Sequence, residues 1–269
     1  MTATIETSTV SSTANLGEQI DPIALRRLVG VELSKMFDTR AGFWLIAAIG
    51  ILSVLATGAA ILFAPDEAIV YDTFAQAVGI PMAIILPIIA ILSITGEYSQ
   101  RTALTTYTLV PRRGRVIVAK ALATLVVGVL GMLLALGVGA LGNLLGSSIT
   151  GLDAVWGFSV GELAILVLAN LLGMAVGFML GVLIRSSPGA IVAYFVYSLV
   201  LPGILDLLAA FQDWFADMQP WVDVNFTITR LYENEVTTQM WSQLGVTTLL
   251  WIFIPLGIGV RLALRSEVK

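Results

Sequence analysis

The sequence predicts an all-α integral membrane protein with six membrane-spanning helices. Hydrophobic residues make up 58% of the 269-residue chain and charged residues only 12%, and the mean hydropathy is +0.94. This composition lies far outside the range of soluble domains. Apolar runs of roughly 20 residues, the length that crosses about 30 Å of hydrocarbon, recur six times. The chain therefore has room for one membrane domain and little else.

The apolar runs place the six spans at about 43–63, 73–95, 119–145, 160–184, 188–205 and 243–262. Residues 1–20 are polar, rich in Ser and Thr, and without periodicity, which predicts a disordered tail. This tail has neither the basic start nor the apolar core of a signal peptide, so we expect the first span to remain as an anchor. Residues 21–269 form the membrane domain in this interpretation.

The basic residues are distributed very unevenly about these spans. Of the 14 Lys and Arg residues, only Arg230 falls on the side opposite the rest. Basic residues are retained on the cytoplasmic side during insertion, so both termini are predicted to be cytoplasmic and the acidic loops to face out. The thirteen residues on the predicted cytoplasmic side are Arg26, Arg27, Lys35, Arg40, Arg101, Arg112, Arg113, Arg115, Lys120, Arg185, Arg261, Arg265 and Lys269.

Several kinds of chemistry are disfavoured by the residues that the chain lacks. It has no Cys and no His, so disulfides, thiolate chemistry, the commonest metal ligand and the usual general base are absent. No basic face interleaved with aromatics points to nucleic acid. No ionisable residue lies in the middle of a predicted span, which argues against a proton-driven porter and against intramembrane proteolysis, although neutral oxygens can still bind Na⁺.

Residues 21–40 predict a basic amphipathic helix before the first span. Asp21 is a suitable N-cap and Pro22 a suitable first helical residue. We expect this helix to lie in the cytoplasmic interface with its basic residues toward lipid phosphate. The alternative is a simple orientation signal for the first span. The apolar face comprises Leu25, Leu28, Val29, Leu33, Met36 and Phe37, and the polar face comprises Arg26, Arg27, Ser34, Lys35 and Asp38.

Two spans carry helix-packing signals. Pro81 and Pro87 should each remove a backbone hydrogen bond and bend the second span, either as a packing kink or beside a transport pathway. Small residues recur every four positions along the fourth span, which lets helix backbones approach closely. We expect this face to pack within one chain in preference to between subunits. Its residues are Ala169, Gly173, Gly177 and Gly181.

Two segments outside the spans are too patterned for plain loops. Residues 96–120 predict a short helix over 102–109, closed by the Pro111 that follows it, with Arg112, Arg113 and Arg115 at the headgroup level. This element either docks on a partner or serves as a connector. Residues 206–243 mix acids with aromatics that suit an interfacial belt, a re-entrant hairpin or a simple anchor. These aromatics are Phe211, Trp214, Phe215, Trp221, Phe226, Tyr232 and Trp241.

The first of these segments resembles the signature of ABC-2 type transporter permeases, the membrane subunits of type V-like ABC exporters. The resemblance rests on Glu97-Tyr98, Thr102, Leu109, Pro111, Arg113 and Ala119-Lys120, with Arg101 where the family usually has Gly. The resemblance implies a cytoplasmic coupling helix that rests on a separate nucleotide-binding subunit. It also implies that short helices between the fifth and sixth spans dip into the outer leaflet and form a gate. The implied coupling residues are Glu97, Tyr98, Thr102, Thr105, Tyr107, Leu109, Pro111 and Arg113, and the implied gate residues are Trp214, Phe215 and Trp221.

The chain has no G-x-x-x-x-G-K-[ST] motif, so it is not expected to be an enzyme or to hold a cofactor. The resemblance therefore implies a partner ATPase that binds ATP and Mg, and a second permease subunit, identical or different. The expected function is export of an amphipathic or hydrophobic substrate, such as a drug, peptide or lipid-like molecule, across a prokaryotic cytoplasmic membrane. Two alternatives stay open: a gradient-driven secondary transporter or channel, and a non-transporting docking or sensor subunit.

Overall fold

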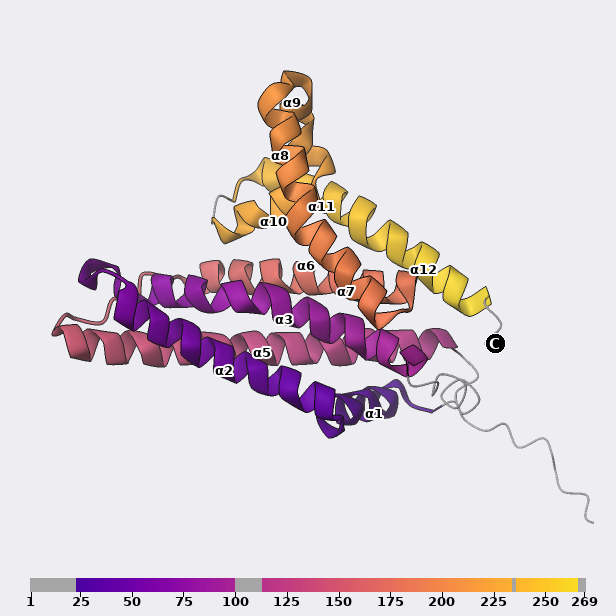
Figure 1. The fold of residues 1–269 in the computed structure, drawn as a ribbon, viewed down its shortest axis with the longest axis horizontal. Helices are drawn as coiled ribbons and strands as arrows, with labels where there is room; N and C mark the ends of the chain where they lie inside the picture. Colours follow the sequence, from indigo (N-terminus) through magenta and orange to yellow (C-terminus); the bar gives the residue numbers. More distant parts are fainter. Residues whose placement is uncertain (1–22, 100–112, 234–235, 266–269) are drawn as a thin grey trace, which may run out of the picture.

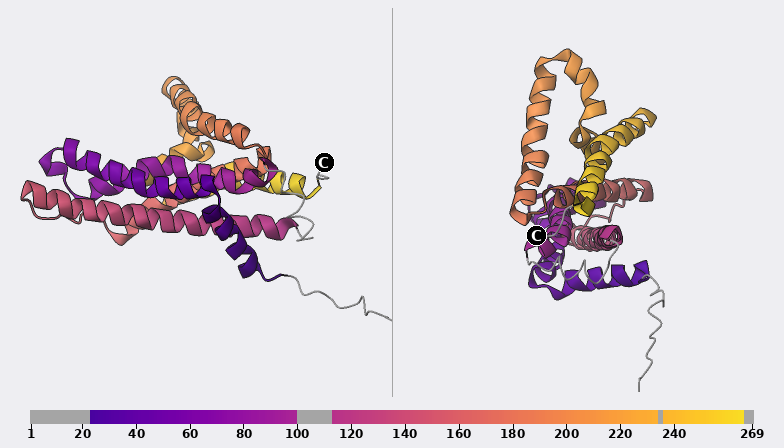
Figure 2. Two further views of the ribbon diagram at one scale, coloured as in Figure 1. Left: turned by 60° about the horizontal axis from the view of Figure 1, so that its bottom comes forward. Right: turned by 90° about the vertical axis from the view of Figure 1, so that its right-hand side faces the viewer.

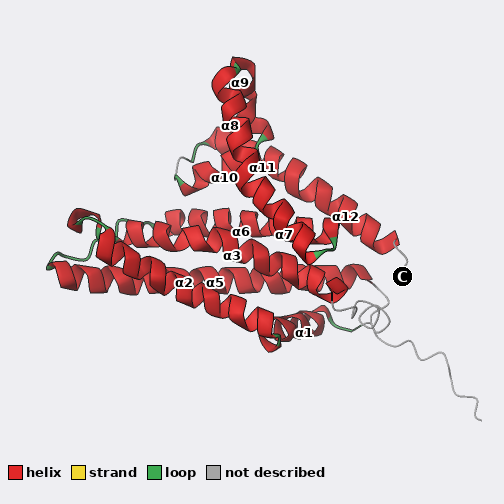
Figure 3. Ribbon diagram, viewed as in Figure 1, coloured by secondary structure: helices red, strands yellow, loops and turns green. Residues whose placement is uncertain are grey.

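The computed structural model describes residues 23–99, 113–233 and 236–265. Within these residues every regular element is a helix (Figure 3). Six of the helices are long and apolar enough to cross a membrane. The expectation of an all-α, multi-pass membrane protein is therefore confirmed.

The helices follow one another with short connections. In chain order they are α1 (Leu25–Asp38), α2 (Arg40–Phe63), the 3-10 helix η1 (Asp66–Ala68), α3 (Tyr71–Ser99), α5 (Arg113–Thr150), α6 (Val160–Ile184), α7 (Ser187–Phe195), the π-helix η2 (Val196–Val200), α8 (Leu201–Phe211), α9 (Asp213–Val222), α10 (Val224–Tyr232), α11 (Thr238–Thr248), the π-helix η3 (Leu249–Phe253) and α12 (Ile254–Arg265).

The fourth span has the expected bounds, whereas the others extend beyond them. α5 is the longest, since it begins at Arg113 and ends at Thr150. At its far end Ser147 and Thr150 donate to carbonyls of the preceding turn, which supports the helix beyond its apolar stretch. The fifth span, 187–211, joins α7, η2 and α8, and the sixth, 238–265, joins α11, η3 and α12.

Four of the long helices form a bundle, and the last two spans lean away from it. α2, α3, α5 and α6 lie side by side, and α3 packs against the other three (Figures 1 and 2). In the last two spans α7 and α12 pack against α6, whereas α8 leads away from the bundle to a tip that it forms with α9. The fifth span is the least buried of the six, so most of its surface is left apolar and exposed.

One end of the bundle holds α1, the start of α5, the α6–α7 turn and the end of α12, and we call it the basic end (Figure 1). The opposite end of α2, α3, α5 and α6 holds η1 and the connection 151–159. The helices thus place the described basic clusters together, as a positive-inside arrangement requires.

This arrangement gives a direct labelling prediction. Ser34 on α1 and Asp153 in the connection after α5 are both exposed, and they lie at opposite ends of the bundle. Because the chain has no Cys, Ser34→Cys and Asp153→Cys each create a single reactive thiol. In intact cells a membrane-impermeant thiol reagent should label Asp153→Cys and spare Ser34→Cys until the membrane is permeabilised. Rapid labelling of Ser34→Cys in intact cells would show that the protein has the opposite orientation in the membrane.

α3 and α6 approach each other closely at a proline. Pro87 has no N–H to pair with the Ala83 carbonyl four residues earlier. The Tyr194 hydroxyl of α7 donates to that carbonyl at 2.6 Å and so compensates for the missing bond. Gly177 of α6 lies directly against Pro87: a Cβ on Gly177 would stand 2.5 Å from the Pro87 carbonyl oxygen. In this chain the proline acts at a packed helix crossing.

The stripe of small residues on α6 faces α3 along this crossing. Ala169 is fully buried, and a Cβ on Gly181 would come within 3.3 Å of the Ile91 Cα. A Cβ on Gly173 would meet its nearest neighbours, on Pro87 and Tyr194, only at 4.0 Å. The stripe therefore packs within the chain, with Gly177 at its tightest point.

Candidate functional site at the basic end

Four charged side chains from three helices meet at the basic end, and we call them the ion cluster: Glu32 and Lys35 of α1, Glu97 of α3 and Lys120 of α5. The Lys35 ammonium lies 2.8 Å from Glu32 Oε1 and 2.8 Å from Glu97 Oε1. The Lys120 ammonium lies 2.5 Å from Glu32 Oε2 and 3.1 Å from Glu97 Oε1. Each cation therefore bridges both carboxylates, and the four formal charges sum to zero.

Three of the four side chains are withdrawn from solvent. The exposed side-chain fractions are 5% for Lys120, 8% for Glu32 and 11% for Glu97, against 41% for Lys35. Lys120 also donates to the Ser93 carbonyl of α3 at 3.1 Å. Buried charges are tolerated only when they are paired and hydrogen-bonded, so removal of one partner leaves an expensive isolated charge. The cluster thus joins α1, α3 and α5 to one another.

The charge state of Lys35 follows from its surroundings. Partial burial on its own lowers the pKa of a lysine, but the hydrogen bonds and charges of Glu32 and Glu97 outweigh it and raise the pKa of Lys35 above its ordinary value of 10.5. Lys35 is therefore a cation throughout the physiological pH range.

Further polar contacts reinforce the same end. Arg115 of α5 donates to the Ile23 carbonyl just before α1 at 2.6 Å. Thr124 of α5 donates to the Ser93 hydroxyl at 3.1 Å, and Ser187 of α7 donates to Thr95 of α3 at 2.8 Å. α1, α3, α5 and α7 are thus joined by directional bonds at the basic end.

The orientation of α1 differs from the simplest expectation for an interfacial helix. Its apolar face packs on α5 and α2, and Arg26 and Arg27 are exposed. Glu32 lies in the middle of that inward face, among Leu28, Leu33 and neighbouring apolar residues. The physical reason is the charge: Glu32 gains its partner Lys120 only if this face turns toward the bundle.

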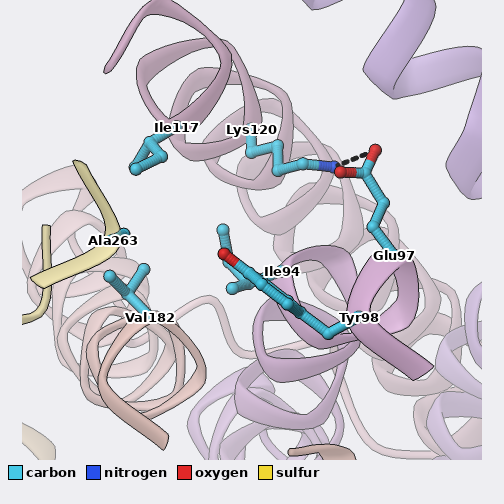
Figure 4. A pocket seen from close by; sticks show the side chains of 7 residues that line it. All are labelled: Ile94, Glu97, Tyr98, Ile117, Lys120, Val182 and Ala263. Carbon is cyan, nitrogen blue, oxygen red and sulfur yellow. Dashed lines mark ion pairs between the residues drawn. The ribbon is translucent and has the colours of Figure 1, made fainter. Parts of the chain in front are cut away.

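A small cavity adjoins the ion cluster (Figure 4). It lies where the ends of α3, α5, α6 and α12 converge. Glu97 and Lys120 contribute its polar wall, and Tyr98 lies beside them across the α3 end. The remaining lining residues are apolar: Ile94, Ile117, Val182 and Ala263. Its acid and base are already paired with each other, and among the described residues no group of acids has the arrangement of a metal site.

The residues implied by the family resemblance are only partly described. Glu97 and Tyr98 line the cavity, and Arg113 is the first residue of α5. Thr102, Thr105, Tyr107, Leu109 and Pro111 lie outside the described residues. The ion cluster nevertheless brackets this segment, because Glu97 precedes it and Lys120 follows it.

Sequence reasoning did not single out Glu32, Lys35 or Lys120 as cluster members. One signal for Glu32 was present: an acid stands within the apolar stripe of α1, four residues after Leu28 and four before Met36. A carboxylate on an apolar helix face needs a buried partner. The identity of that partner, 88 residues away, is not encoded in any local pattern.

The aromatics proposed for an outer gate have unequal environments. They lie on α9, where Trp214 is exposed, Trp221 is at the margin of exposure and Phe215 is buried. Trp214 and Phe215 make an edge contact with ring centroids 5.7 Å apart. Phe215 is thus a packing residue of α9, while Trp214 and Trp221 lie on the outward surface of this helix.

A polar network joins α8, α9 and α10. Gln219 of α9 donates to Asp206 of α8 at 2.8 Å and to Asp223 at 3.3 Å. Asp223 caps α10 by accepting from the Asn225 N–H at 2.9 Å. Burial raises the pKa of Asp223 above its ordinary value of 3.8, although these hydrogen bonds oppose the shift. The carboxylate costs least to bury where donors surround it, and this fixes the α9–α10 junction.

Comparison of the sequence with known protein families and with characterised proteins finds no match.

Proposed function

We propose that this chain is the membrane permease subunit of an ATP-driven ABC transporter of the ABC-2 type. The observation that carries the proposal is the ion cluster. It joins α3, which precedes residues 100–112, and α5, which follows them, to each other and to α1 through ion pairs in which Glu32, Glu97 and Lys120 are largely buried. A partner that displaces this segment would therefore act on α1, α3 and α5 together.

In this proposal a separate ATPase subunit binds ATP and Mg and docks on residues 97–113. Glu97, Tyr98, Thr102, Thr105, Tyr107, Leu109, Pro111 and Arg113 form or support the docking element. Nucleotide binding to the partner favours one of two conformations of the permease, and this differential affinity drives transport. A second permease subunit, identical or different, completes the assembly.

The proposed cargo is an amphipathic or hydrophobic molecule, exported across a prokaryotic cytoplasmic membrane with both termini inside. The apolar spans and the largely unburied fifth span support a pathway that tolerates such a molecule. On the outer side Trp214, Phe215 and Trp221 form the gate, with the two tryptophans at the membrane interface, where indole rings accumulate. In the same proposal α1 lies at the inner interface, with Arg26 and Arg27 toward lipid phosphate.

Co-purification tests the partner. The tagged protein, extracted from its native membranes, should bring with it a polypeptide that contains a P-loop and hydrolyses ATP. Tyr107→Ala and Leu109→Ala, singly and together, should weaken this association or uncouple hydrolysis from transport, because docking by a short helix depends on a few anchors. Gln212→Ala, at an exposed position beyond the fifth span, is the matched control and should leave both unchanged.

Three other outcomes of the association and transport measurements would each indicate a different role for the chain or for this segment. Unchanged association and coupled hydrolysis in the Tyr107→Ala/Leu109→Ala variant would reduce the segment to a connector. Transport by the reconstituted chain without an ATPase, driven by an ion gradient, would identify a secondary transporter. An associated ATPase without transport of any amphipathic cargo would identify a docking or sensor subunit.

A further inference from the structure

The fifth and sixth spans carry the same irregularity. In each, five residues form a π-helix, one residue follows, and the next is a proline: Pro202 after η2 and Pro255 after η3. The N–H of Leu201 bonds to the Val196 carbonyl, and that of Ile254 to the Leu249 carbonyl, so each bond reaches back five residues. Such π-segments are rare and occur frequently at functional sites. We call η2 and η3 the paired breaks.

The paired breaks lie side by side. The ring of Tyr197 in η2 and the ring of Trp251 in η3 are in contact, with centroids 5.6 Å apart. η2 lies between α7 and α8, and η3 lies between α11 and α12, the helices labelled in Figure 1. The two π-helical segments are therefore neighbours in space, although 54 positions separate Tyr197 from Trp251 in the sequence.

The junction between α9 and α10 is bonded to both breaks. The indole N–H of Trp251 donates to the Val222 carbonyl at 2.6 Å. The Asn225 amide donates to the Tyr197 carbonyl at 3.1 Å. Val222, just before Asp223, and Asn225, two residues after it, thus connect one short junction to the sixth and to the fifth span.

The Asn225 bond has a specific cause in the sequence. A π register would pair the Tyr197 carbonyl with the N–H five residues later, which is Pro202, and proline has no N–H. An unpaired carbonyl inside a membrane helix is costly, so a side-chain donor is needed. Asn225 supplies it, and the outer helices thereby become part of the hydrogen bonding of the fifth span.

The helices between the two breaks, α8 to α11, are packed against one another. α9 packs against α8 and α11, and α10 packs against α11. Gln219 and Asp223 add the polar network between α8, α9 and α10. The contact of these helices with α6 includes the buried apolar residues Val224, Ile228 and Leu231 of α10. Apolar contact is not directional, so it permits sliding where hydrogen bonds do not.

We propose that the paired breaks form a hinge on which α8–α11 turns as one unit, and that Asn225 and Trp251 are the positioning residues that hold this unit in the conformation described here. The inference concerns a motion of the chain itself. It needs no ATPase, and it stands or falls separately from the proposed function.

Spin-label distance measurements in lipid nanodiscs test the hinge. One labelled pair, Asp217→Cys with Asp153→Cys, reports on the unit relative to the bundle, and a second, Asp217→Cys with Gln239→Cys, reports within the unit. All three positions are exposed, and the chain has no other Cys to label. In the Trp251→Phe/Asn225→Leu variant a second distance in the first pair should gain population about fivefold for each bond lost, which corresponds to about 1 kcal/mol per hydrogen bond. The second pair should not change.

Two further variants sharpen the test. Trp251→Phe alone keeps an aromatic ring against Tyr197 and removes only the donor, so it gives the answer if the double variant does not fold. Pro202→Ala/Pro255→Ala restores the missing N–H groups and should narrow the first-pair distribution. The hinge is overturned if the first pair is unchanged in Trp251→Phe, or if the distances within the unit change as much as those across it.

Discussion

Lys120→Met should cost about 3–5 kcal/mol of folding stability, the typical effect of removing one partner from a buried ion pair. The substitution keeps the approximate length and apolar stem of the side chain and removes its charge. Glu32 and Glu97 would then share only Lys35, which is partly exposed. An excess negative charge would remain at a site where the Glu32 and Glu97 side chains are 8% and 11% exposed.

A second substitution separates charge balance from packing. Glu32→Gln/Lys120→Met leaves Glu97 with Lys35 and restores neutrality, so most of the lost stability should return. Replacement of both partners of a buried pair by neutral groups of similar volume is often neutral or stabilising. Thermal unfolding in detergent, followed by size-exclusion chromatography of the remaining monodisperse protein, measures both variants.

Lys35→Met is the matched control for this experiment. It removes a cation from the same cluster, but its 41% exposed side chain lets solvent screen the carboxylates, so the loss should be about 1 kcal/mol or less. Equal unfolding temperatures for Lys120→Met and Lys35→Met would show that burial of the ion cluster contributes little. Failure of the double variant to recover would assign the loss to packing.

Gly177→Ala should destabilise the protein by about 1–3 kcal/mol, the usual cost of excess volume in a packed core. The new Cβ would lie 2.5 Å from the Pro87 carbonyl oxygen and 2.8 Å from its Cα. These are backbone atoms of a neighbouring helix, so they cannot yield as the tip of a flexible side chain does. α3 and α6 would have to separate, and the hydrogen bond from Tyr194 to the Ala83 carbonyl would be disturbed.

Gly173→Ala provides the control, because Gly173 lies one turn away on the same stripe with its nearest neighbours at 4.0 Å. Replacement of a helical glycine by alanine at an open position is expected to be neutral or stabilising by up to about 1 kcal/mol. The two variants should therefore shift the unfolding temperature in opposite directions. Similar shifts for both would mean that helix propensity, and not the α3–α6 contact, governs this face.

Several features followed from local patterns and could be predicted. Span number and class depend on apolar length alone, so the six spans were placed correctly apart from their ends. At the far end of α5, which continues past its apolar run to Thr150, the hydroxyls of Ser147 and Thr150 find partners in carbonyls four residues earlier. The stripe from Ala169 to Gly181 marked a helix contact by its spacing, and the contact lies within the chain. Pro81 and Pro87 were recognised as irregular, whereas Pro202, near the end of the fifth apolar run, and Pro255, inside the sixth, were not.

The class of the protein can be read from local patterns, because long apolar runs must become helices in lipid and their basic flanks bias their orientation. Which distant groups meet depends instead on how the helices pack. The ion cluster joins residues 32, 35, 97 and 120, and the Asn225 amide finds the Tyr197 carbonyl. The physical reason is that apolar burial is additive and readable along the chain. A buried charge or an unpaired carbonyl, in contrast, indicates only that a partner is required. Which residue becomes the partner depends on the fold.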